Sequence, residues 1–151
     1  MPFYIAYRGD AGGASADYNE LRSQESMISI IVPCYNEQEA LPFFHEEISR
    51  VLKEIGEDYE LLFVNDGSKD DTLKELKALS TKDPHVIYLS FSRNFGKEAA
   101  MYAGFCNAKG DYIAVMDADL KDPPALLPEM LKMLETDEYD SVATRRVSRE
   151  G

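Results

Sequence analysis

Three aspartates stand close together in "VMDADLKDPP" (residues 115–124), where an apolar run gives way to two prolines. Asp117 and Asp119 alternate around Ala118, so an extended backbone directs both carboxylates to the same side. Two such groups repel each other unless a cation lies between them. Carboxylate oxygens suit Mg²⁺ or Mn²⁺, which commonly bind few protein groups together with phosphate and water oxygens. The pair predicts a divalent metal site, and the alternative is a polar turn with one capping and one solvated aspartate.

The segment "NDGSKDD" (residues 65–71) follows another apolar run and contains groups that can bind a nucleoside. Asp66 and Ser68 can hydrogen-bond a base or a ribose, and Gly67 allows another backbone to approach closely. A turn followed by a helix cap is the alternative for the same residues.

The segment "SRNFGKE" (residues 92–98) is locally basic, although the protein as a whole is acidic. Arg93 and Lys97 flank the backbone N–H groups near Gly96, at the expected start of a helix, where anions are favoured. The segment predicts a local anion site, and a solvated basic pair is the alternative.

The segment "PCYNE" (residues 33–37) follows the first strongly apolar run. Pro33 stiffens the exit from that run, and Tyr35 offers a flat aromatic face. Asn36 or Glu37 can cap the helix that follows.

The hydrophobic pattern predicts the elements that position these four segments. Apolar, β-branched or aromatic runs predict buried strands at residues 28–32, 59–65, 86–91, 112–116 and 139–144. Helical spacing or composition occurs between or after them, at residues 41–55, 73–79, 96–110 and 124–135. Such alternation is typical of strand–helix–strand crossover units. We therefore predict an α/β fold with a doubly wound, mostly parallel sheet and helices on both faces, whose carboxyl edge gathers the four segments.

Composition excludes several classes of protein. The chain has 151 residues and a net charge of -12, from 16 Lys and Arg against 28 Asp and Glu, so a nucleic-acid partner is not expected. Its two cysteines form no disulfide framework, and no apolar run approaches a membrane span, so the chain as given is expected in the cytoplasm. Neither GxGxxG nor GxxxxGK[ST] occurs, which removes support for a dinucleotide dehydrogenase or a P-loop nucleotidase.

Residues 1–26 differ in character from the rest of the chain, with an aromatic patch, a small-residue stretch and then polar residues. We predict that they form a flexible leader, derived from upstream read-through or from cloning. The alternative for the patch "FYIAY" is an additional strand that docks on the sheet.

The motifs "ISIIVPCYNEQEAL", "FVNDGSKDDT", "SFSRNFGKEAA" and "GDYIAVMDADLKDPP", in this order and spacing, resemble those of family 2 glycosyltransferases with the GT-A fold. They are most similar to bacterial polyprenyl-phosphate glycosyltransferases, relatives of dolichol-phosphate mannosyltransferase. The resemblance implies that residues 27–151 are the nucleotide-sugar-binding part of such a domain, truncated before the acceptor half and any membrane helices. It also implies an inverting sugar transfer from a UDP-sugar, or alternatively GDP-mannose, to a polyprenyl phosphate.

The resemblance assigns roles to residues of the four motifs. Nucleotide binding is implied for Pro33, Tyr35, Glu37, Asp66, Arg93, Lys97 and Asp117. Asp117 and Asp119 would hold Mg²⁺ or Mn²⁺ on the diphosphate and so take part in catalysis. Two positions depart from the family pattern, because Asn65 stands where an acid is common and Lys121 where glutamine is common.

The segment "TRRVSRE" (residues 144–150) provides basic side chains after the last predicted strand. The resemblance and the charge of Arg145 suggest that it grips the acceptor phosphate, and a solvated basic tail is the alternative. No residue for a general base is identified, and we expect the fragment to be inactive alone. The full-length protein is expected at the cytoplasmic face of the membrane, in the cell envelope, with a homo-oligomer left open.

Other functions compete with this prediction. Transfer to a polysaccharide hydroxyl would use the same donor site. A receiver-like α/β binding module would use an acidic pocket and Lys97, although such domains place their acids after the first strand, where this chain has "PCYN". A nucleotidyltransferase shares the metal chemistry but should prefer a nucleoside triphosphate.

Overall fold

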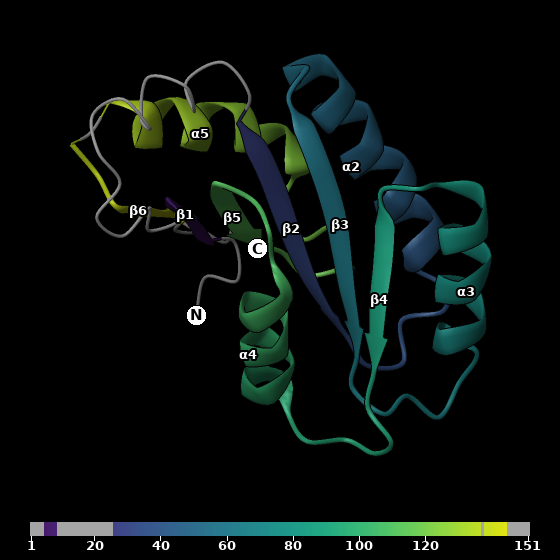
Figure 1. Cartoon of the computed structure of the whole chain (residues 1–151). Helices are drawn as coiled ribbons and strands as arrows, with labels where there is room; N and C mark the ends of the chain where they lie inside the picture. The colour runs from purple at the N-terminus through teal and green to yellow at the C-terminus, as the bar shows by residue number, and fades with distance from the viewer. Residues whose placement is uncertain (1–4, 9–25, 137, 145–151) are drawn as a thin grey trace, which may run out of the picture.

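The computed structural model of the protein describes residues 5–8, 26–136 and 138–144. In this part of the chain six strands form one sheet in the order β4-β3-β2-β5-β1-β6 (Figure 1). The strands are β1 (Ile5–Arg8), β2 (Met27–Cys34), β3 (Asp58–Asn65), β4 (Val86–Ser90), β5 (Tyr112–Val115) and β6 (Ser141–Ala143). The helices are α2 (Leu41–Ile55), α3 (Thr72–Lys82), α4 (Lys97–Asn107) and α5 (Leu127–Glu135), with a short 3₁₀ turn, η1 (Pro124–Leu126), before the last.

The central strands confirm the predicted α/β fold with a mostly parallel sheet. Strand β2 pairs in parallel with β3 on one side and with β5 on the other, and β3 pairs in parallel with β4. Crossover helices connect these strands, as parallel pairing requires. The carboxyl ends of the four strands therefore point to one edge of the sheet.

Strand β1 corrects part of the predicted leader. It lies between β5 and β6 and is antiparallel to both, with Ile5 opposite Val115 and Ala143. Ala6 is completely buried. The flexible leader over residues 1–26 is therefore wrong for Ile5–Arg8, where the alternative of an additional strand is correct. The rest of that segment, apart from Ser26, lies outside the described residues.

The helices cover the sheet unequally. Helices α2, α3 and α5 bury the larger core on one face, where the ring of Phe44 meets that of Phe63 edge-on at 6.1 Å. On the other face α4 packs Met101 and Phe105 against the smaller core, which includes Ile31. No helix in the described ranges is long and apolar enough to cross a membrane.

A glycine determines how closely α4 packs on the sheet, but no glycine ends this helix. A Cβ on Gly104 would lie 2.4 Å from a methyl carbon of Ile31, so the glycine lets the helix approach β2 closely. The end predicted by the helical stretch at residues 96–110 is wrong, because α4 ends at Asn107 and not at Gly110. Gly110 lies in the turn before β5, where its N–H donates to Ser29 Oγ at 2.7 Å.

Candidate functional site

The loops after β2, β3, β4 and β5 leave the sheet at its carboxyl edge, as the sequence predicts (Figure 1). They comprise residues 35–40, 66–71, 91–96 and 116–123. Every predicted site residue within the described ranges lies in these loops, at the end of β2 or at the start of α4. Arg145, the candidate for the acceptor phosphate, lies outside the described residues.

The first two loops are tied together by reciprocal hydrogen bonds. The N–H of Asn36 donates to Ser68 Oγ at 2.9 Å, and the N–H of Lys69 donates to Asn36 Oδ1 at 2.8 Å. The N–H of Glu37 donates to Thr72 Oγ1 at 2.9 Å. Asn36 has a φ of 52°, a left-handed conformation that asparagine tolerates better than most residues.

These contacts correct the expectation that Asn36 or Glu37 caps the next helix. The N-cap of α2 is Ala40, which makes no side-chain cap bond. Instead, the carbonyl of Glu37 accepts hydrogen bonds from the N–H groups of Ala40 and Leu41, both at 3.1 Å. The Asn36 side chain therefore fixes the position of one loop against another.

Asp66 is buried and holds the loop that follows β4. Its Oδ1 accepts the N–H of Phe95 at 2.7 Å, and its Oδ2 accepts the N–H of Gly96 at 3.1 Å and the side-chain amide of Asn94 at 3.2 Å. The neighbouring Gly67 has a φ of 65°. A Cβ there would lie 2.1 Å from the carbonyl carbon of Arg93, so the close backbone approach expected at this glycine is made by the chain itself.

The predicted basic pair is divided between two environments. The guanidinium of Arg93 lies 3.9 Å above the ring of Phe95, on the exposed side of the loop. Lys97, the first residue of α4, places its Nζ 2.6 Å from Asp117 Oδ1. Lys97 therefore contacts the predicted metal site, whereas Arg93 faces outward.

Asp117 and Asp119 follow the end of β5, and each contacts a lysine. Asp119 Oδ1 accepts the backbone N–H of Lys121 at 3.1 Å, and Lys121 Nζ lies 3.6 Å from Asp119 Oδ2. Leu120 between them has a φ of 58°, which is costly for a branched side chain. The backbone of this loop is therefore strained directly after Asp119.

Negative charge accumulates around Glu37. Partial burial raises the pKa of the Glu37 carboxyl, and the carboxylates of Asp119 and Asp117 raise it further. Burial, Glu37 and Asp117 also raise the pKa of the Cys34 thiol, so this cysteine is no activated nucleophile. Three carboxyl groups therefore interact across the carboxyl edge, and a cation would relieve their repulsion.

The donor atoms suit a metal that is shared with a ligand. In the described residues, no group of three or more His, Cys, Asp or Glu side chains is arranged to hold a metal ion. Asp117 and Asp119 supply two hard oxygen donors, too few for a closed structural zinc site. Mg²⁺ and Mn²⁺ fit this donor set, because they complete their coordination with phosphate and water oxygens.

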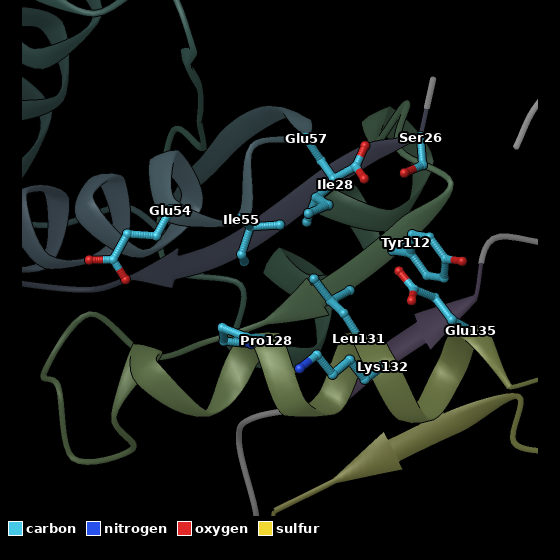
Figure 2. A pocket seen from close by; sticks show the side chains of 10 residues that line it. All are labelled: Ser26, Ile28, Glu54, Ile55, Glu57, Tyr112, Pro128, Leu131, Lys132 and Glu135. Carbon is cyan, nitrogen blue, oxygen red and sulfur yellow. The ribbon is translucent and has the colours of Figure 1, made fainter. Parts of the chain in front are cut away.

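Two cavities mark opposite ends of the sheet. A polar cavity of about 360 Å³ lies beside the first two loops and is lined by Asn36, Glu37, Gln38, Glu39, Ala40 and Asp70. Another of about 430 Å³ lies at the amino end, between the end of α2, β2 and α5 (Figure 2). Its floor includes Ile28 and Leu131, and no predicted site residue lines it. The predicted site residues therefore lie at the carboxyl end of the sheet, where the smaller, polar cavity is found.

Sequence reasoning missed the residues that connect the loops. Asp70 accepts the backbone N–H of Gln38 at 3.3 Å, and Gln38 Oε1 accepts the N–H of Asp71 at 2.8 Å. Neither hydrogen bond leaves a periodic signal, because the partners are far apart in the chain. The polar loop composition was the only trace of them in the sequence.

Comparison with known proteins places this site in a family. The model of the family described as "Glycosyl transferase family 2" matches residues 29–151. The chain is 48% identical over 123 residues to CsbB of Bacillus subtilis (strain 168), covering 82% of this chain and 37% of that protein. It is 40% identical over 124 residues to an undecaprenyl-phosphate 4-deoxy-4-formamido-L-arabinose transferase of Proteus mirabilis (strain HI4320), covering 82% and 38%. The chain thus spans about two fifths of the length of these relatives.

A solved structure shares the fold. The mannosyltransferase PcManGT from Pyrobaculum calidifontis, in complex with GDP-Man and Mn²⁺, superposes with a TM-score of 0.62 at 22% identity, covering 73% of this chain and 32% of that one. The predicted GT-A architecture is confirmed. The match of the family model to most of the chain, together with the loops at the carboxyl edge, shows that the chain belongs to glycosyl transferase family 2.

Proposed function

We propose that this chain binds a nucleotide-diphosphate sugar at the carboxyl edge of its sheet, for inverting transfer of the sugar to a polyprenyl phosphate. The observation that carries the proposal is that Asp117 and Asp119, in the loop after β5, lie close enough to Glu37, in the loop after β2, for their charges to raise the pKa of its carboxyl. Family membership supports the class of enzyme and argues against a receiver-like module. The name of the Proteus mirabilis relative supports a polyprenyl-phosphate acceptor.

The nucleoside would lie against the first three loops. Tyr35 is 43% exposed and can offer its ring to a base, with Pro33 and Glu37 beside it. Asp66 would support the nucleoside indirectly, by holding the loop after β4 in place, because three donors of that loop already occupy its carboxylate oxygens. Arg93 can reach a phosphate from the outer side of its loop. A UDP-sugar is the favoured donor, and GDP-mannose is the alternative.

Asp117 and Asp119 would hold Mg²⁺ or Mn²⁺ together with the donor diphosphate. When bound, the ion would neutralise the charge that builds on the leaving nucleoside diphosphate. An acceptor oxygen attacks the anomeric carbon from the opposite side while the bond from that carbon to the diphosphate breaks, which inverts the configuration. The charges of both aspartates act on the Glu37 carboxyl, so the negative charge of Glu37 would also attract the ion.

A polyprenyl-phosphate acceptor would need little help from a general base. A phosphate with a second pKa of about 6 is mostly ionised at neutral pH and can attack directly. Arg145 is our candidate for binding this phosphate. We place the whole protein at the cytoplasmic face of the membrane, because a polyprenyl phosphate is held there by its lipid chain. Transfer to a polysaccharide hydroxyl is the alternative.

A thermal-shift panel tests the donor site. Binding at 100 times Kd stabilises the folded state by about 2.7 kcal/mol, which corresponds to a Tm increase of about 5 to 10 °C for a chain of this size. We expect this increase with Mn²⁺ plus UDP-glucose or GDP-mannose. Asp119→Ala should abolish it, whereas Asp140→Ala, which removes an exposed carboxylate before β6, should retain it.

The panel also has outcomes that contradict the proposal. The absence of a Tm shift with every sugar nucleotide in the presence of Mn²⁺ would refute the proposed donor site. A larger shift with a nucleoside triphosphate than with the matching diphosphate sugar would indicate a nucleotidyltransferase.

A further inference from the structure

Each candidate metal ligand in this structure is already in contact with a positive charge. Lys97 Nζ lies 2.6 Å from Asp117 Oδ1, and Lys121 Nζ lies 3.6 Å from Asp119 Oδ2. The two lysines come from different elements, the start of α4 and the loop after β5. The aspartate pair is therefore partly neutralised before any metal ion arrives.

The two contacts differ in strength. The Lys97 and Asp117 side chains are 36% and 24% exposed, and their distance is that of a charge-assisted hydrogen bond. The Lys121 side chain is 69% exposed and its Nζ is more distant, so solvent weakens that pair. Lys97 is therefore the stronger internal counter-ion.

A metal ion bound to Asp117 would compete with Lys97 for the negative charge of this carboxylate. A divalent ion would bind the carboxylate oxygens at about 2.1 Å. The ammonium group would then lie within a few ångströms of two like charges, where Coulomb repulsion is strong. This repulsion weakens the contact of Lys97 with Asp117, and the diphosphate on the same ion offers the ammonium group another anion.

We propose that Lys97 is a displaceable counter-ion, which occupies Asp117 until a divalent ion and a diphosphate bind together and then transfers to the diphosphate. The proposal rests on the proposed donor site. Its consequence is that the metal alone binds weakly, whereas metal and nucleotide strengthen each other's binding. Two ligands that share one such exchange are thermodynamically coupled, and the coupling is reciprocal.

Electron paramagnetic resonance of Mn²⁺ tests the coupling without any transfer reaction. The signal of free Mn²⁺ gives its Kd for the chain, measured with and without UDP. Lys97→Met should tighten Mn²⁺ binding in the absence of UDP by about five- to tenfold, because the competing charge is gone. The same variant should reduce the strengthening caused by UDP by a similar factor, since the diphosphate has lost its lysine.

Three further variants separate this effect from general electrostatics. Lys132→Met removes one positive charge at the amino end of the sheet (Figure 2) and should leave both Kd values unchanged. Lys121→Met should change them less than Lys97→Met, because its pair is longer and more exposed. Lys97→Arg keeps the charge and should retain part of the coupling.

The outcomes distinguish this proposal from the proposed function. If Mn²⁺ binds neither the unmodified chain nor Lys97→Met, with or without UDP, the donor site itself is refuted. If Mn²⁺ and UDP bind cooperatively but Lys97→Met has the same Kd values as the unmodified chain, the donor site stands and the exchange of Lys97 is refuted. Weaker Mn²⁺ binding by Lys97→Met in the absence of UDP refutes it as well.

Discussion

Single residues at the carboxyl edge hold one loop against the next. Asp66 gives its oxygens to the loop that follows β4, and Asn36 is joined to the loop that follows β3. Gly67 leaves the space in which the backbone at Arg93 lies. These contacts fix the loops before any ligand binds, which reduces the conformational entropy that ligand binding must overcome.

Gly67→Ala tests how tightly the loops are packed. The new methyl group would need a left-handed φ and would collide with backbone at 2.1 Å, so we expect a loss of about 2 to 4 kcal/mol in the free energy of unfolding. Gly56→Ala is the matched control, because Gly56 also has a positive φ but nothing lies within 4 Å of its Cβ position. It should cost only about 1 to 2 kcal/mol. Urea denaturation measures both, and equal losses would contradict the packing argument.

The sequence predicts the candidate ligands better than their partners. Asp117 and Asp119 are recognisable because two carboxylates alternate after an apolar run. The lysine that contacts Asp117 is twenty positions earlier and is the first residue of α4. Ion pairs between distant segments depend on the tertiary arrangement, so Lys97 could be predicted to be near an anion but not to bind Asp117.

At the scale of elements, Asp83 connects the end of α3 to α2 and to the turn before β4. It follows α3, and its oxygens contact His45 Nε2 from α2 and His85 Nδ1 from the turn before β4, both at 2.8 Å. The His85 ring stacks on Tyr59 of β3 at 4.0 Å. Both histidines of the chain thus meet one carboxylate.

The Asp83 cluster predicts a pH dependence of stability. Burial raises the pKa of the Asp83 carboxyl, but hydrogen bonds from His45 and His85 outweigh it, so the pKa lies below its ordinary value of 3.8. A carboxyl with a lowered folded-state pKa stabilises the fold above its unfolded pKa, and this contribution is lost as the pH falls through the folded value. Asp83→Asn should therefore cost more at about pH 7 than at about pH 3.

Urea denaturation at the two pH values measures this difference. The matched background carries His45→Gln and His85→Gln, in which Asp83→Asn should have a much smaller pH-dependent cost. An unchanged pH dependence in that background would show that the histidines do not cause it.

The elements themselves follow from local patterns, whereas their ends do not. Every predicted strand and helix occurs, because alternating apolar runs and helical spacing are encoded within short windows. The end of α4 at Asn107 and the absence of side-chain caps on α2 depend on contacts with distant loops. Strand β1 was only an alternative, since its partners are β5 and β6 and no nearby segment indicates them.

At the scale of the whole molecule, β1 completes the sheet. It is the strand that connects β6 to β5, so the sheet order depends on four residues far from their partners in sequence. Ala6 is completely buried, which leaves no space for a larger or charged side chain.

Ala6→Asp tests whether β1 is part of the folded structure. An unpaired buried carboxylate should reduce the free energy of unfolding by about 3 to 5 kcal/mol. Ala78→Asp on the exposed side of α3 is the control and should cost less than about 1 kcal/mol. Chemical denaturation compares the two, and a cost for Ala6→Asp as small as that of the control would show that β1 is not required.

The position of β1 also has a consequence for the order of folding during synthesis. Among the described strands β1 leaves the ribosome before the others, yet Ile5 pairs with Val115 and Ala143. The parallel strands β2, β3, β4 and β5 can assemble while β6 is still being made, and β1 can pair with the sheet only after β5 has been made. Until then β5 presents an open edge, at which the β1 strand of another nascent chain can pair.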